Sequence, residues 1–353
     1  MNRSLAHRSW QRHAAAVIFM VILVGGLYSV KWHPYYLRSF VAAAHHSIGP
    51  SILLSGDSKA IPSPSWGAAW AYASAYGKAI WVALVLGLLV GSGVQAAAVP
   101  PRWIESLFGR RGIRGVAAGG LAAVPAMMCT CCTAPVVVGL RRARSTVGSS
   151  LAFWLANPLL NPATIVFTGF VLGWNWAALR LAFALPVVFG LAYLTERIVQ
   201  GVGPSPARLS ETSGNSEADL FLLRWGRELG RLSIRLLPEY AIIVLALGAA
   251  RAWLFPTVPA ATGNDVLWIT ALAAVGTAFV IPTAGEVPIV QSLMALGLGS
   301  GPAAALLITL PAISVPSAVM VSRAFPRRVM WIVATGVVLS GIACGLVAKA
   351  LGF

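Results

Sequence analysis

Three of the four cysteines in this chain of 353 residues lie within four residues of one another, in the segment MMCTCCTAP at 127–135. Cys129, Cys131 and Cys132 lie in an apolar stretch, and thiolates bind soft centres such as Cu(I) or trivalent arsenic. No histidine or second cysteine pair follows at the spacing of a structural zinc site. The pattern indicates ligands for a soft metal or metalloid, or a thiol relay, with apolar packing as the alternative.

The fourth cysteine, Cys344, stands alone in the last apolar run, which indicates a packing role. A bridge between the adjacent Cys131 and Cys132 would be strained. A disulfide is therefore expected only with Cys344 or between two chains.

The composition is that of a membrane protein. Of all residues, 58% are hydrophobic and 10% are charged, and a run of about 20 apolar residues crosses a bilayer. The net charge of +16 comes from short basic clusters between the apolar runs, which orient a membrane protein and argue against a nucleic-acid partner. The predicted runs lie at 14–30, 66–98, 113–140, 147–172, 175–197, 237–256, 266–296, 301–322 and 329–352.

The first run follows Arg3, Arg8 and Arg12 without a small-residue cleavage site, so an uncleaved helix with a cytoplasmic N-terminus is expected. Residues 31–64 are expected to form an external loop with one interfacial helix. The segment 198–220 has loop composition. The expected organisation is an N-terminal helix and external loop at 1–65, a first repeat at 66–200, a cytoplasmic linker at 201–236 and a second repeat at 237–353.

The two halves of the chain resemble each other at an offset of 153 residues. Between 129–168 and the segment that follows it by this offset, 8 of 40 positions are identical without a gap. The matches include Pro135 with Pro288, Gly148 with Gly301, and Pro158 with Pro311. An internal repeat is predicted, and the cysteine segment then has a counterpart around Glu286.

The positions of the arginines predict that two apolar runs turn back inside the membrane. If 113–140 crossed once, Arg141 and Arg142 would lie opposite the cluster at 102–114, which breaks the positive-inside bias. A hairpin that enters and leaves on the cytoplasmic side removes this conflict. A matching hairpin at 266–296 from the other side puts Arg323, Arg327 and Arg328 on the cytoplasmic side as well. The two repeats are then inverted, as in many secondary transporters, whose sites lie between the repeats.

Prolines flank both hairpin tips and interrupt the helices that follow. Each proline removes a backbone donor and bends a helix, and non-helical backbone at membrane depth must be buried in protein or line a cavity. The helix after the first hairpin carries Asn157-Pro158 and Asn161-Pro162, and its counterpart carries Ser314 near Pro311 and Pro316. The two tips and the two broken helices are expected to meet and line one passage.

Glu286 is the strongest single polar signal in the second hairpin. An acid at mid-membrane costs about 2.5–3.5 kcal/mol on insertion scales and marks an ion path. Glu286 is expected on the second tip, close to the thiols, where it would couple transport to protons. A structural role, in which it accepts backbone N–H groups freed at Pro282 and Pro288, is the alternative.

These residues resemble a family of predicted permeases that includes organoarsenical efflux permeases of the methylarsenite type, over roughly 66–352. Cys129 and Cys131 match two cysteines of that family, whereas Thr130 replaces a serine and Cys132 replaces a glycine. The resemblance implies a permease for trivalent arsenicals, in which Cys132 matters least. The paired hairpins with cysteines are also similar to thiosulfate-uptake transporters, which implies a second substrate class.

The expected fold is an all-α polytopic membrane protein with two inverted repeats, each with a proline-flanked re-entrant hairpin and a broken helix, after one extra helix. The expected function is efflux of a trivalent organoarsenical or related soft metalloid through the inner membrane, without a cofactor or enzymatic activity. Uptake of a sulfur-containing anion and a non-transport thiol relay or metal-handling protein remain alternatives, and self-association is left open. The expected substrate contacts are Cys129, Thr130, Cys131, Cys132, Asn157, Asn161, Thr283, Glu286 and Ser314, with the three cysteines as ligands of a soft metal or metalloid.

Overall fold

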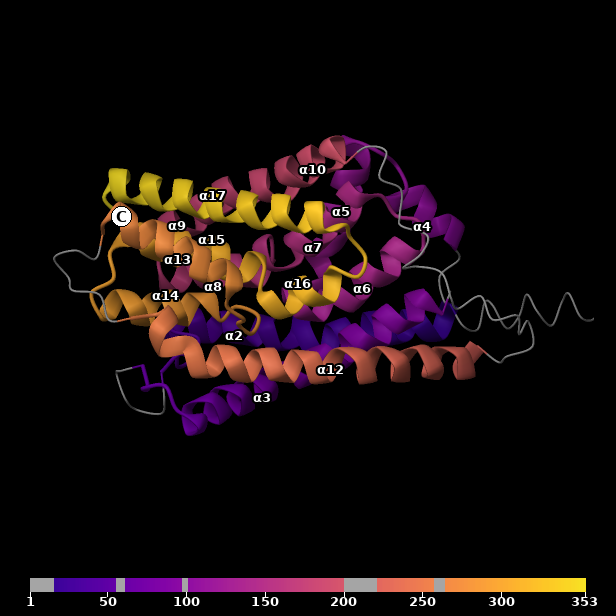
Figure 1. Cartoon of the computed structure of the whole chain (residues 1–353), viewed down its shortest axis with the longest axis horizontal. Helices are drawn as coiled ribbons and strands as arrows, with labels where there is room; N and C mark the ends of the chain where they lie inside the picture. Colours follow the sequence, from indigo (N-terminus) through magenta and orange to yellow (C-terminus); the bar gives the residue numbers. More distant parts are fainter. Residues whose placement is uncertain (1–15, 55–60, 97–100, 200–220, 257–263) are drawn as a thin grey trace, which may run out of the picture.

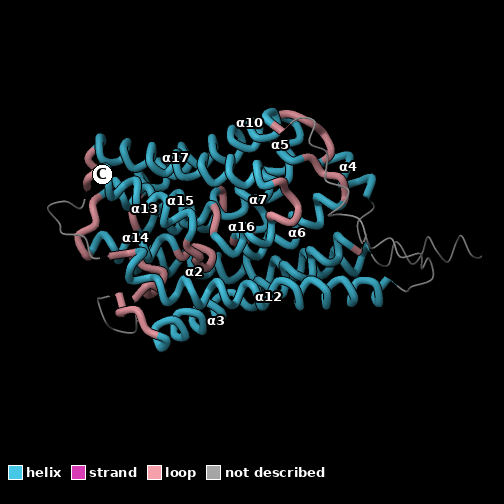
Figure 2. Tube along the Cα trace, in the orientation of Figure 1, coloured by secondary structure: helices cyan, strands magenta, loops and turns pink. Residues whose placement is uncertain are grey.

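The computed structural model describes residues 16–54, 61–96, 101–199, 221–256 and 264–353. Within these ranges the regular structure is helical and contains no strand, as Figure 2 shows. Seven helices in the described ranges are long and apolar enough to cross a membrane. The predicted all-α polytopic class is confirmed, and the chain is a multi-pass membrane protein.

The N-terminal helix is longer than predicted. It runs from Ala16 to His45 and includes the π-helical turn η1 (Tyr28–Trp32) and α2 (His33–His45). The stretch 31–64 was expected to be a loop with one interfacial helix; its residues 31–45 are helical and continue the first helix without a break. Pro34 cannot donate to the helical hydrogen-bond pattern, and the widened π turn before it lets the helix continue.

The helices of the first half include the two helices of the first hairpin, α5 and α6, and the two parts of the first broken helix, α7 and α8. They are α3 (Trp66–Gln95), α4 (Pro101–Phe108), α5 (Ile113–Ala123), the short 3₁₀ turn η2 (Val124–Ala126), α6 (Thr130–Arg142), α7 (Val147–Leu159), α8 (Pro162–Val171), α9 (Trp174–Leu185), the π turn η3 (Pro186–Leu191) and α10 (Ala192–Ile198).

The second half follows the same order. Its helices are α12 (Phe221–Leu254), α13 (Val266–Ala278), α14 (Glu286–Ala295), α15 (Ser300–Ala312), α16 (Val315–Val321) and α17 (Arg327–Leu351). Residues 221–236, which were assigned to the linker, form the first half of α12, because this stretch has leucines at helical spacing. The remaining linker residues, 201–220, lie outside the described residues.

The helix boundaries of the two halves agree at the offset of 153 residues. Four pairs of helices begin 153 residues apart: α5 and α13 at Ile113 and Val266, α7 and α15 at Val147 and Ser300, α8 and α16 at Pro162 and Val315, and α9 and α17 at Trp174 and Arg327. The pair α7 and α15 also ends at the same offset, at Leu159 and Ala312. The sequence offset therefore relates equivalent elements of the structure.

The runs 113–140 and 266–296 each fold into two short helices whose outer ends are neighbours. The N–H of Thr146, after α6, donates to the carbonyl of Phe108, before α5, at 2.9 Å. The N–H of Gly301, after α14, donates to Oδ1 of Asn264, before α13, at 2.9 Å. Figure 1 shows α4 and α5 toward one end of the molecule and α13 and α14 toward the other, so the two hairpins approach from opposite ends.

Two helices are broken near their prolines. The break between α7 and α8 lies at Leu160–Asn161, and Asn161 Oδ1 accepts from the N–H groups of Ala163 and Thr164 at 3.0 and 3.4 Å. The equivalent break before α16 is capped by Ser314, whose side chain and backbone both bond to Ser317. Each second half-helix therefore begins at a capped N-terminus, where backbone dipoles give a positive potential.

The close packing of α3 on α6 depends on two glycines four residues apart. A Cβ at Gly87 would overlap the carbonyl oxygen of Cys132, and one at Gly91 would come within 2.6 Å of the carbonyl carbon of Pro135. Small residues at this spacing let membrane helices approach closely. The position of the cysteine segment is therefore set by the surface of α3.

We expect Gly87→Ala to push α6 away from α3 and to lower stability by about 1–3 kcal/mol, the usual range for overpacking. The measurement is the free energy of unfolding of the purified protein in micelles. Gly77→Ala on the same helix is the matched control, because nothing lies within 4 Å of its added Cβ. Equal stability of the two variants would contradict the close contact at Gly87.

Candidate functional site

The first hairpin tip is non-helical backbone that α7 holds in place. The N–H of Met128 donates to Asn157 Oδ1 at 3.3 Å, and Trp154 Nε1 donates to the carbonyl of Thr130 at 3.2 Å. Asn157 also donates to the carbonyl of Phe153 at 2.9 Å. The predicted site residue Asn157 thus orients the tip through its backbone.

Cys129 and Cys132 form a close pair of thiols at the start of α6. Cys129 precedes the first helical residue, and its Sγ lies 3.0 Å from Cys132 Sγ, three residues later. All four cysteines are free and buried. Residues three apart share a helix face, so this pair is one that the sequence analysis did not consider, and a disulfide with Cys344 or between chains stays a prediction.

Cys131 faces a different set of groups. Its Sγ lies 3.5 Å from Ser314 Oγ, 3.9 Å from Thr130 Oγ1 and 4.0 Å from the hydroxyl of Tyr76, which in turn lies 2.5 Å from the Tyr240 hydroxyl. In the described part of the chain, no three His, Cys, Asp or Glu side chains are placed to hold a metal ion. Binding of one soft centre by all three thiols stays a prediction, and it requires the side chain of Cys131 to turn toward Cys129 and Cys132.

The second tip contacts the N-terminal helix and α3. Lys31 Nζ donates to Thr283 Oγ1 at 3.1 Å, and the Tyr72 hydroxyl donates to the carbonyl of Val280. The neighbour of Lys31, Trp32, donates from Nε1 to the carbonyl of Pro125 at 2.7 Å, next to the first tip. The π turn η1 therefore contacts both hairpins, although sequence reasoning assigned this stretch to a loop.

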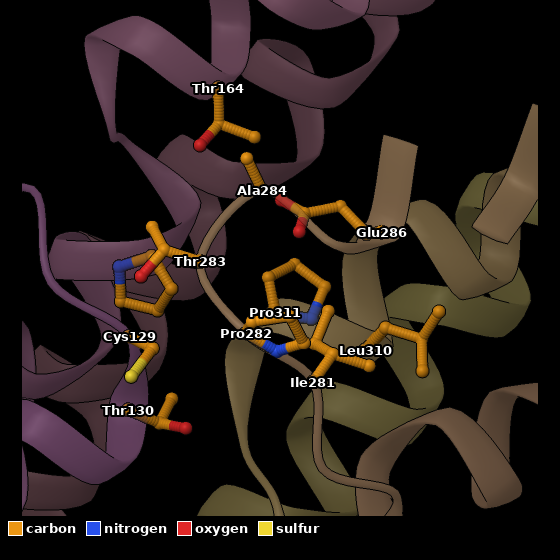
Figure 3. A pocket seen from close by; sticks show the side chains of 11 residues that line it. Cys129, Thr130, Thr164, Ile281, Pro282, Thr283, Ala284, Glu286, Leu310 and Pro311 are labelled. Carbon is orange, nitrogen blue, oxygen red and sulfur yellow. The ribbon is translucent and has the colours of Figure 1, made fainter. Parts of the chain in front are cut away.

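A small cavity lies where the tips and the broken helices meet. Figure 3 shows Cys129 and Thr130 at one end, Thr164 and Glu286 at the other, and Thr283 between them. The cavity has a volume of about 10 Å³, which is roughly the minimum for one water molecule. A solute of several atoms therefore enters only after the tips move. The lining residues are Cys129, Thr130, Pro158, Thr164, Ile281, Pro282, Thr283, Ala284, Glu286, Leu310 and Pro311.

Glu286 forms a buried ion pair with Arg180 of α9. Arg180 Nη2 lies 2.8 Å from Glu286 Oε1, and both side chains are almost completely buried. Although the pair is close, its angle is poor for a hydrogen bond, and Glu286 Oε1 has no hydrogen-bond partner. The same guanidinium donates to the carbonyls of Pro158 and Leu159 at 2.9 and 3.4 Å, which the helix break exposes.

Three donor groups of this ion pair, of the cavity lining and of the adjacent helix break also lack hydrogen-bond partners. They are Arg180 Nη1, Asn161 Nδ2 and Thr164 Oγ1, all completely or nearly completely buried. Unpaired polar atoms at a buried site are costly and call for a water molecule or a ligand. The end of the cavity around Glu286 is therefore polar and incompletely satisfied, whereas the other end presents thiols.

The structure brings together most of the residues that the sequence singled out. Cys129, Thr130, Thr283 and Glu286 line the cavity, and Ser314 contacts Cys131. Asn157 and Asn161 lie behind the lining, where they hold backbone. The sequence analysis did not single out Lys31, Tyr72, Tyr76, Arg180 and Tyr240. Lys31 and Arg180 could have been found, because a charge within an apolar stretch marks a functional site.

Comparison with known proteins agrees with this architecture. The chain matches a family described as predicted permeases over residues 66–350. It belongs to the predicted permease family. This match begins at α3 and leaves out the N-terminal helix that carries Lys31.

Two curated relatives cover most of the chain. The UPF0718 protein YraQ of Escherichia coli (strain K12) is 45% identical over 332 residues, which is 93% of this chain and 93% of the relative. The UPF0718 protein MJ0584 of Methanocaldococcus jannaschii is 23% identical over 334 residues, which is 75% of this chain and 90% of the relative. No solved structure matches the chain.

We expect the ion pair between Arg180 and Glu286 to show strong energetic coupling. Removal of one partner from a buried pair costs about 3–5 kcal/mol, because the other charge stays buried and unpaired. The double variant Arg180→Met, Glu286→Leu should therefore lose less stability than the sum of the single variants, by roughly 2–3 kcal/mol. The measurement is a double-mutant cycle on the free energy of unfolding.

The exposed pair Arg323 and Glu239 provides the control, with Nη2–Oε1 at 2.6 Å and side chains 39% and 47% exposed. A cycle with Arg323→Gln and Glu239→Gln should give less than about 1 kcal/mol of coupling. Additive effects at Arg180 and Glu286 would show that the two charges are not paired in solution.

Proposed function

We propose that this permease carries a small solute with a soft centre that the thiols at the first hairpin tip bind. The observation that carries the proposal is the close Cys129–Cys132 pair at the edge of the cavity between the two tips. Two thiols at this distance suit a soft, trivalent centre better than a hard cation. A trivalent organoarsenical or related metalloid, moved outward, is the first substrate class.

The proposed passage is the meeting point of two inverted repeats. In each hairpin the two outer ends are hydrogen-bonded neighbours, and the two hairpins start from opposite ends of the bundle, which supports re-entrant segments. Their non-helical tips lie inside the protein, where such backbone is tolerated at membrane depth. The basic clusters near 102–114, 141–144 and 224–235 then share the cytoplasmic side of the inner membrane. This orientation places the N-terminus in the cytoplasm.

Glu286 is the proposed coupling residue. Its ion pair with Arg180 joins α14 of the second hairpin to α9 of the first half. Protonation of Glu286 would remove its charge and weaken this connection, so that the second tip is free to move. The proton gradient and the opening of the cavity would thereby be linked at one pair of residues.

A second candidate is uptake of a sulfur-containing anion. The buried Lys31 at the second tip favours it, since its ammonium group bonds Thr283, which lines the same cavity as Cys129, and attracts a negatively charged solute. The half-helix N-termini of α6, α8 and α14 also bring positive potential to the cavity. A thiol relay to a partner protein finds less support, because all three cysteines of the tip are buried.

We expect replacement of either thiol of the close pair to abolish transport. Cys129→Ser and Cys132→Ser each keep the volume but lose a soft ligand, and flux of methylarsonous acid or thiosulfate into proteoliposomes should fall to the level of empty liposomes. Cys344→Ser is the control, because Cys344 is buried in α17 away from the cavity. Full flux in the double variant Cys129→Ser, Cys132→Ser would make the pair a packing feature.

The same liposomes test the role of Glu286 when a pH difference is imposed. Wild-type protein should accumulate solute along the gradient, whereas Glu286→Gln should retain exchange but lose accumulation. Gradient-driven accumulation by the Gln variant would leave Glu286 with a purely structural role.

The topology makes a separate prediction. Single cysteines at positions 110, 143 and 227, in a chain without its native cysteines, should react with an impermeant maleimide only from the cytoplasm. These positions lie before the first hairpin, after it and in α12. Labelling of position 143 from outside would contradict the re-entrant hairpin.

A further inference from the structure

Lys31 is a buried charge without an acidic partner in the described part of the chain. Its side chain is 3% exposed, and its hydrogen bonds go to the neutral hydroxyls of Thr283 and Tyr35. Cys129 and Cys132 are close enough to interact with it electrostatically. A buried ammonium group of this kind needs a negative charge nearby.

A pocket lined by arginines lies at the end of the bundle that carries the basic clusters. This vestibule has a volume of about 650 Å³, within the usual range for small-molecule sites. Four arginines and two glutamates line it, so its side chains carry an excess of two positive charges. They are Arg142, Arg231, Arg235, Arg323, Glu228 and Glu239.

Three helices connect this vestibule to the hairpin tips. Along α6 the chain runs from Arg142 inward to Cys131, and along α12 from Arg235 to Tyr240. The third helix, α16, begins at the cap Ser314 and is followed by Arg323. The inner residues of these helices meet at the Cys131 thiol, which contacts Ser314 and Tyr76, while Tyr76 contacts Tyr240.

The arginines of the vestibule also repel one another. Glu228 pairs with two of them: its Oε2 lies 3.9 Å from Arg142 Nη1, and its Oε1 lies 3.1 Å from Arg231 Nη1. Burial lowers the pKa of Arg142, Glu228 opposes this, and Arg231 and Arg235 lower it further. An anion in the vestibule would relieve this repulsion, whereas a neutral solute would not.

We propose that the solute is a small anion with a soft centre, that the arginine vestibule admits it, and that Lys31 is its counter-ion at the hairpin tips. The inference rests on the proposed permease function, and within that function it favours the second candidate, a soft anion, over a neutral arsenical. It also gives the N-terminal helix, which the family match leaves out, a role in specificity. The negative charge would lie beside Lys31 while the soft atom reaches the Cys129–Cys132 pair.

The test compares two solutes in proteoliposomes of neutral lipid: thiosulfate, a soft anion, and methylarsonous acid, a neutral soft solute. Wild-type protein should carry thiosulfate. Lys31→Met should lower its flux by about 30-fold or more, as expected for loss of a buried charge partner. Lys31→Arg should restore much of it, and Lys78→Met is the matched control, because Lys78 is exposed on α3.

A second variant tests the vestibule independently of folding around Lys31. Arg235 is exposed at the vestibule, and Arg235→Gln should lower thiosulfate flux and its dependence on salt, with little effect on methylarsonous acid. Arg328→Gln is the control, since Arg328 is exposed and lies outside the vestibule. Equal flux in both arginine variants would overturn the role of the vestibule.

The outcomes separate this inference from the proposed function. If wild-type protein carries neither solute, the proposed function fails. If it carries methylarsonous acid but not thiosulfate, the function stands and the anion inference is overturned. Equal loss of both fluxes in Lys31→Met would mean that Lys31 is the counter-ion of the cysteine thiolates and not of the solute. Anionic phospholipid that copurifies with wild-type protein but not with Arg235→Gln, at unchanged flux, would mean that the vestibule binds lipid.

Discussion

Two stretches of non-helical backbone meet inside an apolar helix bundle, and their polar groups must find partners in the protein because the bilayer offers none. The partners come from separate elements. Asn157 binds the N–H of Met128, Trp32 binds the carbonyl of Pro125, and Tyr72 binds the carbonyl of Val280. Arg180 donates hydrogen bonds to the carbonyls at the break between α7 and α8. The site therefore exists only when helices from the whole chain are assembled.

This requirement explains why the cavity between the tips is small. Side chains of α7 and η1 bond the first tip, and side chains of α3 and η1 bond the second. Met127 and Ala284 hold positive φ angles of 50° and 66°, which non-glycine residues adopt at a cost. The ties are single hydrogen bonds rather than continuous helical ladders. Loss of a few of them would release a tip, whereas the long helices α3, α12 and α17 would stay packed.

Sequence patterns predicted the parts of this arrangement that depend on local chemistry. Prolines marked the breaks, the offset of 153 residues marked equivalent helices, and charge bias led to the hairpins. Partners across the bundle were not predictable, because nothing local says that Arg180 meets Glu286 or that Lys31 meets Thr283. The Cys129–Cys132 pair was predictable, since the residues are three apart at a helix start, but the family resemblance pointed to Cys129 and Cys131 instead.

The two halves share a backbone plan but differ in chemistry. At the offset of 153 residues, Cys129, Cys131 and Cys132 correspond to Pro282, Ala284 and Gly285, and Arg180 corresponds to Val333. The first tip therefore supplies all the thiols, while the second supplies the acid that Arg180 binds. A solute between the tips meets a soft face on one side and a polar, charged face on the other. Such a site orients its ligand, and an asymmetric solute with one soft atom and one charged group fits it better than a symmetric one.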